Sequence, residues 1–183
     1  MGKLFVFSGC SGVGKSTVLG IVMNERKDLQ FSVSATTRDP RPGEHHGVAY
    51  YFVSKEKFVD MIQNDEFLEY DDHMDNYYGT PKHQITEKLP RGSVILDIEP
   101  NGAFNVKKQM QEAVLIFIAP KSLDVLEERL RKRGDTTEEQ IKIRLERAAW
   151  EMEQGKRYDY YVINDRLDDC VNEILNIIAQ EAK

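Results

Sequence analysis

A glycine-rich stretch near the start of the chain carries residue types that bind phosphate groups. Residues 9–16 read GCSGVGKS and fit the pattern G-x-x-x-x-G-K-S/T. Successive backbone N–H groups of such a loop point at one spot, and glycines permit the tight turn and the close approach of a ligand. Lys15 can reach the β- and γ-phosphates of a nucleotide, and the Ser16 hydroxyl can bind Mg²⁺. The pattern predicts a nucleotide phosphate site.

The segments on either side of this loop supply the context that such a site needs. The apolar residues 4–7 predict a buried strand before the loop. Apolar residues at helical spacing from Val18 to Met23 predict a helix after it. A helix that begins at the loop adds unpaired N–H groups and the positive end of its dipole. The order strand, loop, helix therefore supports a phosphate site rather than a chance glycine turn.

Two arginines form a second candidate phosphate site. Arg38 and Arg41 lie in the polar segment 35–44, which Pro40 and Pro42 break. Guanidinium groups on a rigid loop are suited to a bidentate grip on phosphate. The same segment also fits a solvated basic turn, and its residues alone do not decide between the two.

Further polar candidates lie on predicted strands. Tyr50, Glu69 and Tyr78 fall on strand segments of a small mixed region, residues 34–88. Asp97 ends the hydrophobic run 93–97, which predicts a buried strand with a carboxylate at its end. Ligands of parallel sheets bind at the carboxyl ends of the strands, so Asp97 is a candidate site residue.

The remaining pattern predicts an α/β fold with a parallel sheet flanked by helices. Helices are predicted to begin after Ser54, after Thr80 with Pro81 in the first helical position, after Ser122, and after Thr136 or Thr137. The predicted strands are residues 4–7, 31–34, 48–53, 67–73, 76–79, 93–97, 114–118 and 160–163.

Length and composition limit the classes of protein. The chain has 183 residues, 40% hydrophobic and 31% charged, which suits one compact domain with modest insertions. A net charge of −6 argues against a protein that coats nucleic acid, and no apolar run is long enough to span a membrane. The two cysteines do not form a disulfide framework, and Cys10 is either a reactive thiol or, as we favour, a small loop side chain. We expect a cytoplasmic protein without membrane or nucleic-acid partners; the oligomeric state is not predicted.

Eight sequence blocks resemble one family in order and over nearly the whole chain. They read GCSGVGKST, FSVSATTRDPRPGE, FLEY, NYYGT, VILDIE, RLRKRG, IRLERA and VIND. In this order they resemble the guanylate kinases of bacterial type. The resemblance implies a P-loop core (residues 1–33, 89–128 and 151–183), a GMP-binding insertion (residues 34–88) and an arginine-bearing lid (residues 129–150).

The resemblance also implies a reaction and a set of site residues. The reaction is Mg²⁺-dependent transfer of a phosphoryl group from ATP to GMP or dGMP, giving ADP and GDP or dGDP. The implied ATP-binding residues are Gly9, Cys10, Ser11, Gly12, Val13, Gly14, Lys15, Ser16, Thr17 and Arg133, with Ser16 on Mg²⁺ beside ATP phosphates and waters. The implied GMP-binding residues are Ser34, Arg38, Arg41, Glu44, Tyr50, Glu69, Tyr78, Thr80 and Asp97. The implied catalytic residues are Lys15, Arg38, Arg133 and Arg144.

The chain departs from the family pattern at several positions. Thr80 stands where many members have Ser, Glu99 where Asp is common, and Asn101 where Gln is usual. The acidic segment 71–75 is also unusual, and we interpret it as a solvated turn. These departures are expected to alter the guanine pocket or the waters of Mg²⁺ slightly.

Two other functions fit the same fold. The first is a non-catalytic guanylate-kinase-like binding module, but such modules typically have degraded phosphate loops, whereas Lys15 and Ser16 are present here. The second is a related kinase that phosphorylates another small phosphate compound. The full set of guanine-reading candidates argues against that alternative.

Overall fold

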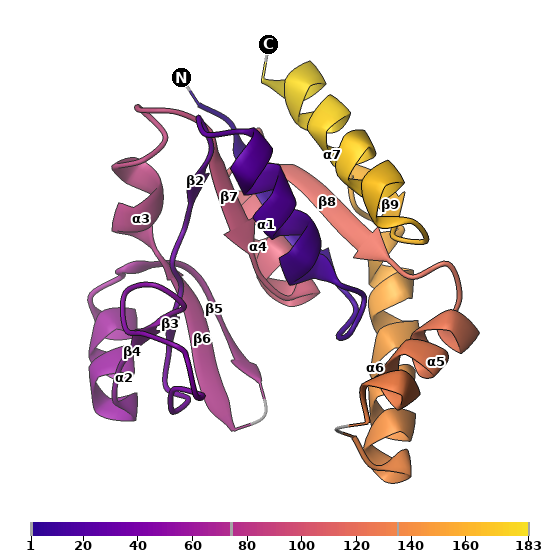
Figure 1. Ribbon diagram of the computed structural model, residues 1–183. Helices are drawn as coiled ribbons and strands as arrows, with labels where there is room; N and C mark the ends of the chain where they lie inside the picture. Colours follow the sequence, from indigo (N-terminus) through magenta and orange to yellow (C-terminus); the bar gives the residue numbers. More distant parts are fainter. Residues whose placement is uncertain (1, 74, 135, 183) are drawn as a thin grey trace.

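The computed structural model describes residues 2–73, 75–134 and 136–182. Its centre is a five-stranded sheet in which every neighbouring pair is parallel, in the order β2-β7-β1-β8-β9 (Figure 1). The strands are β1 (Leu4–Gly9), β2 (Gln30–Phe31), β7 (Val94–Asp97), β8 (Val114–Ala119) and β9 (Tyr160–Ile163). All residues of β8 are buried, as expected for a parallel strand with both faces covered. The predicted α/β fold with a parallel sheet is confirmed.

Helices cover both faces of this sheet. On one face α1 (Lys15–Glu25) packs against α7 (Leu167–Glu181), and on the other α4 (Pro100–Gln109) packs against α6 (Glu138–Gly155) (Figure 1). The helix α5 (Leu123–Arg133) packs on α6. None of the described helices is long and apolar enough to cross a membrane.

A second, smaller sheet lies at the lower left in Figure 1. Its strands are β3 (Ala35–Thr36), β4 (Tyr51–Phe52), β5 (Phe67–His73) and β6 (Asn76–Pro81), in the order β4-β3-β6-β5. Helix α2 (Lys55–Gln63) packs against it, with the Phe58 ring stacked on Phe67 at 4.4 Å between centroids. The short helix α3 (Lys82–Thr86) leads back to the central sheet. This unit thus has a small aromatic core of its own.

Two predicted strands differ from the structure. Of residues 31–34 only Phe31 lies in a strand, at the end of β2, which pairs with β7 in the central sheet. The next strand, β3, begins at Ala35, in the segment expected to be a loop, and pairs with β4 and β6 in the second sheet. The chain leaves one sheet for the other at this point, so the ladder is interrupted. The predicted strand 48–53 shortens to β4, because Val48 and Ala49 instead donate their N–H groups to the carbonyl of His45 in a turn.

Helix starts agree with the sequence prediction at three sites and disagree at one. Ser54 and Ser122 cap their helices, and Thr137, not Thr136, forms the capping box with Gln140. The predicted start at Thr80 is wrong, since β6 continues through Pro81 and α3 begins one residue later.

Gly155 permits close packing of α6 on the central sheet. A Cβ at Gly155 would overlap the ring of Phe117, which is fully buried on β8. We expect Gly155→Ala to lower the free energy of unfolding by about 1–3 kcal/mol, because the core has no room for an added methyl group. Thermal unfolding measures this change.

Gly20 is the matched control. It lies exposed within α1, and a Cβ there would meet no atom within 4 Å. Gly20→Ala is expected to raise the free energy of unfolding by about 0.5–1 kcal/mol. Equal effects of the two substitutions would contradict the packing argument.

Candidate active site

A cleft of about 350 Å³ lies where the phosphate loop, the end of β7, the second sheet and α6 come together. This volume is in the usual range for a small-molecule site. The predicted site residues that line it are Ser11, Lys15, Ser34, Arg41, Tyr50, Glu69, Tyr78, Asp97 and Arg144. Residues far apart in sequence therefore meet at one place, as the prediction required.

The phosphate loop has the geometry that its glycines allow. Gly12 and Gly14 have φ values of 86° and 94°, in the left-handed region that favours glycine. A Cβ on Gly12 would also press on the side chain of Leu130, so the loop and α5 are in close contact. Other residues at these two positions would distort the loop that must approach the phosphates.

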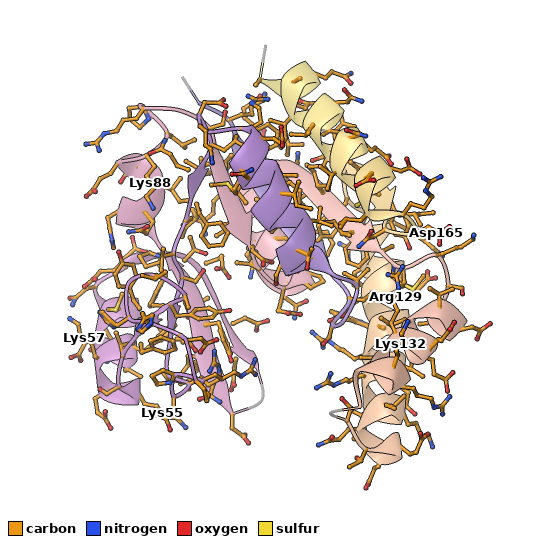
Figure 2. All side chains as sticks on the ribbon, in the orientation of Figure 1. Lys55, Lys57, Lys88, Arg129, Lys132 and Asp165 are labelled. Atoms are coloured by element: carbon orange, nitrogen blue, oxygen red, sulfur yellow. The ribbon has the colours of Figure 1, made fainter. Side chains whose placement is uncertain are left out.

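Two side chains hold the back of this loop at the carbonyl of Val13. Asn164, buried after β9, donates its side-chain N–H at 2.8 Å, and Arg129 on α5 approaches the same carbonyl at 3.5 Å. Arg129 also donates to the carbonyl of Asn164 at 2.9 Å and lies on the same side of the molecule as Asp165 (Figure 2). Sequence reasoning missed Asn164, because only the fold brings it to the loop.

Lys15 and Asp97 form a direct ion pair at the carboxyl edge of the central sheet. Lys15 begins α1 and Asp97 ends β7, and strands β1 and β7 are neighbours in register at Phe7 and Asp97. Burial disfavours the charged form of Lys15, but the charge and hydrogen bond of Asp97 outweigh it and raise the pKa of the lysine. Asp97, predicted for guanine, thus contacts the phosphate-loop lysine here.

The arginine loop is braced by Glu44. Arg38 donates to both oxygens of Glu44, at 3.0 and 2.9 Å, and the backbone N–H of Arg41 donates to the same carboxylate at 2.8 Å. The Arg38 guanidinium lies 5.6 Å from the centre of the Tyr50 ring. The hydrogen bond from Arg41, followed by those from Arg38, lowers the pKa of Glu44. This arrangement orders the loop around Arg41, which lines the cleft.

A β-bulge turns Glu69 toward the cleft. The register of β5 against β6 shifts between Phe67 and Glu69, so that Phe67 packs on α2 while Glu69 lines the cleft. The Thr80 hydroxyl, opposite on β6, donates to Glu69 Oε1 at 2.6 Å. A Cβ on Gly102 would overlap the other carboxylate oxygen, so glycine at that position leaves the space that Glu69 occupies.

Glu69 is buried, with 6% of its surface exposed. Burial raises the pKa of this carboxyl to about 7; the hydrogen bond from Thr80 opposes the rise and the charge of Asp71 adds to it. A buried acceptor of this kind binds best to a ligand that offers N–H donors, because such donors favour the ionised form.

Three charged residues at the α6 side of the cleft were not predicted as a group. Arg147 donates to Glu151 at 3.0 Å and to Glu99 at 3.3 Å. Burial, and then the charge of Glu99, raise the pKa of Glu151 to about 7. The spacing of Arg147 and Glu151, four residues on one helix, is a sequence signal that could have identified this pair. The ion pair with Arg147 therefore connects Glu99 to α6.

The interpretation of the acidic segment 71–75 as a solvated turn is wrong for Asp71. This residue lies on β5, is partly buried and lines the cleft, whereas its neighbour Asp72 is exposed. Met74 and the side chain of His73 lie outside the described residues.

Cys10 is buried, and burial raises the pKa of its thiol to about 12, which keeps the thiol protonated.

Some predicted site residues do not line the cleft. Arg38 and Glu44 lie in the adjacent loop, Thr80 contributes through Glu69, and Ser16 lies exposed at the start of α1. Arg133 ends α5, and its side chain lies outside the part of the chain that the structure describes.

Comparison with known proteins gives one family. The family model described as guanylate kinase matches residues 1–181. The chain is 46% identical over 183 residues to a guanylate kinase of Thermus thermophilus, covering 100% of this chain and 83% of the relative. It is 47% identical over 181 residues to a guanylate kinase of Carboxydothermus hydrogenoformans, covering 98% and 89%. The crystal structure of guanylate kinase from Anaplasma phagocytophilum matches with a TM-score of 0.81 and 32% identity, covering 99% of this chain and 86% of that one.

The raised pKa of Glu69 predicts a pH dependence of stability. An unfolded glutamate loses its proton near pH 4.5, but the folded one keeps it to about pH 7. The folded state therefore binds more protons in this window, so stability falls as pH rises through it, by up to about 3 kcal/mol from this group. Glu69→Gln should reduce the slope, measured by urea unfolding at a series of pH values.

Glu151 contributes a slope of the same sign and remains in the variant, so the slope shrinks without vanishing. An unchanged slope in Glu69→Gln would show that Glu69 is ionised throughout this range.

Proposed function

Because this chain belongs to the guanylate kinase family, we propose that its cleft transfers the γ-phosphoryl group of ATP to GMP or dGMP. The observation that carries the proposal is the meeting of two complementary features in one cleft. Lys15 supplies a phosphate-loop cation, and Glu69, bonded to Thr80, supplies a buried acceptor for a base. One cleft can thus hold a polyphosphate and a purine together.

The phosphates of ATP bind at the loop before α1. Backbone N–H groups of residues 9–17 and the N-terminus of α1 supply donors, and Lys15 reaches the β- and γ-phosphates. Asn164 and Arg129 keep the loop in place through Val13. Arg133 and Arg144 belong to the lid, residues 129–150, and we expect both to neutralise ATP phosphates; Arg144 lines the cleft.

The oxygen groups around this loop suit Mg²⁺. Ser16 presents an exposed hydroxyl in the first turn of α1. Asp97 ends β7 and contacts the neighbouring Lys15, and Glu99 follows β7 and lines the cleft. Mg²⁺ prefers oxygen ligands and usually takes few from the protein, the others being waters and substrate phosphates. Ser16 would hold the ion, which would neutralise charge on the transferring phosphoryl group.

The phosphate of GMP binds at the second sheet. Arg41, Tyr50 and Tyr78 line the cleft there, and Glu44 orders the Arg38–Arg41 loop. A phosphate that enters can accept hydrogen bonds from both guanidinium groups and both phenols. These residues belong to the region 34–88, which we assign to GMP.

The guanine base binds between β5, β6 and the end of β7. Guanine offers N1–H and N2–H donors to carboxylates and an O6 acceptor to hydroxyls. Glu69 and Asp97 provide the acceptors, Ser34 provides a hydroxyl that lines the cleft, and Thr80 orients the Glu69 carboxylate through its own hydroxyl. Adenine would leave the buried carboxylate without a donor, which strongly disfavours AMP.

The transfer itself requires positioning and charge neutralisation. The attacking oxygen of GMP is already ionised, so no general base is needed. Arg38, Arg144 and Arg133 stabilise negative charge as the phosphoryl group moves. Closure of the lid over the GMP region excludes water and limits hydrolysis of ATP.

Replacement of the loop lysine tests the proposal. Lys15→Ala is expected to lower kcat for GMP-dependent ADP release at least about a thousandfold, since it removes a cation from the transferring phosphates. Lys57→Ala is the control, because Lys57 is exposed on α2, remote from the phosphate loop (Figure 2). Wild-type turnover in Lys15→Ala would overturn the proposed role.

Replacement of Glu69 tests the base site separately. Glu69→Gln should raise KM for GMP about a hundredfold and leave KM for ATP unchanged, because two donors of guanine lose a charged acceptor. In the wild type, KM for GMP should also rise as the pH falls below about 7, where Glu69 takes up a proton. An equal rise of both KM values in the variant would remove Glu69 from the base site.

A further inference from the structure

The α6 wall of the cleft carries an arginine that the proposed contacts with ATP and GMP do not use. Arg147 lines the cleft three residues after Arg144, a spacing that places both on one face of the helix. Ile143 and Glu151, four residues before and after Arg147, line the cleft as well. Arg147 therefore belongs to the surface of α6 that faces the cleft.

Three neighbours hold the guanidinium of Arg147 in place. Its Nε donates to Oε1 of Glu151 at 3.0 Å, and its Nη2 donates to Oε2 of Glu99 at 3.3 Å. Its Cζ lies 4.4 Å from the centre of the Trp150 ring, which adds a cation–π contact. Glu151 is itself buried, so the carboxylate that anchors Nε has a fixed position. The guanidinium is thus oriented before any ligand binds.

This guanidinium keeps donors for a ligand. Arginine has five N–H donors, and Nη1 of Arg147 makes no hydrogen bond to a residue in the described part of the chain. The side chain is 36% exposed, so a ligand in the cleft can reach it. Glu44 braces Arg38 in a comparable manner at the proposed site of the GMP phosphate. A guanidinium held in this way binds phosphate with little further loss of side-chain entropy.

The partner of Arg147 connects it to the phosphate loop. Burial lowers the pKa of Lys15, but Asp97 raises it and the charge of Glu99 raises it further, so Glu99 acts on both cations. Arg147 and Lys15 thus share an anionic neighbour after β7, whereas Arg41 lines the cleft from the region of the second sheet. A phosphoryl group that passes from a phosphate at Lys15 to one at Arg41 crosses the space that α6 borders.

We propose that Arg147 is a catalytic residue whose Nη1 donors contact the phosphoryl group during its transfer, beside Arg144. The inference rests on the proposed function, because it assumes transfer from ATP held at Lys15. An oxygen of the GMP phosphate forms the new bond to the γ-phosphorus, the bond from that phosphorus to the β–γ bridging oxygen breaks, and its electron pair leaves with ADP. Arg147 stabilises the negative charge on the other oxygens of the transferring group.

The test is the effect of Arg147 variants on kcat and KM for GMP-dependent ADP release. Arg147→Ala should lower kcat about a hundredfold and leave KM for ATP and GMP within about threefold, as expected for a contact made in the transition state. Arg147→Lys keeps the charge but not the planar fork, so kcat should fall about tenfold. Lys142→Ala is the matched control: it removes an exposed cation of the same helix outside the cleft lining and should keep the wild-type kcat.

A purely structural role for Arg147, as a brace between α6 and Glu99, predicts a different result. Thermal unfolding would then shift, but kcat measured well below the transition would stay at the wild-type value. A wild-type kcat in folded Arg147→Ala, or an equal loss in Lys142→Ala, would overturn the inference and leave the proposed function intact. If Arg147→Ala does not fold, Arg147→Lys decides in the same way. A wild-type protein that releases no ADP with GMP would overturn both.

Discussion

The contact between the Lys15 ammonium and the Asp97 carboxylate joins the proposed ATP-phosphate site to the proposed guanine site. A buried ammonium without a partner is costly, so the phosphate-loop lysine needs an anion even without nucleotide. Asp97 provides it because β7 lies next to β1 and both strands end at the same edge of the sheet. On the proposed account, ATP phosphates replace Asp97 as the partner of Lys15. Asp97 is then free to accept from the base, so that occupation of one half prepares the other.

Elsewhere in the cleft, carboxylates are again paired with the groups that the substrates need. The chain has a net charge of −6, yet its proposed substrates are anions, so the cations must be concentrated locally. Glu44 orders the loop of Arg38 and Arg41, and the bulge in β5 places Glu69 where a base can meet it. Carboxylates thus orient cations on the phosphate side and accept donors on the base side.

The sequence predicts those parts of the site that depend on local geometry. The phosphate loop is contiguous, and its glycine spacing, preceding strand and following helix identify it without a structure. The strand predicted at residues 31–34 was wrong because the chain crosses from one sheet to the other there, with β2 ending at Phe31 and β3 beginning at Ala35, and its strand-like composition does not reveal the crossing. Thr80 resembles a helix cap by its position before proline, but its hydroxyl is bound by Glu69, eleven residues away.

Contacts between distant elements escaped sequence reasoning for a common reason. Three such hydrogen bonds join segments that are close only in the folded chain: from Asn164 to the carbonyl of Val13, from Arg147 to Glu99, and from Asn101 to Asp71. Asp71 was interpreted as solvated because acidic runs usually are. Its place on the cleft face of β5 follows from the bulge, which leaves no distinct pattern in the sequence.

The most direct test of the central claim is ADP release from Mg-ATP with a panel of acceptors: GMP, dGMP, AMP, CMP, UMP and none. We expect release that depends on GMP or dGMP and is near background with AMP, the pyrimidine nucleotides or no acceptor. Release that is equal with AMP and GMP would contradict the role of the Glu69–Thr80 pair in selecting the base. Absence of release with every acceptor would contradict the proposed kinase reaction itself.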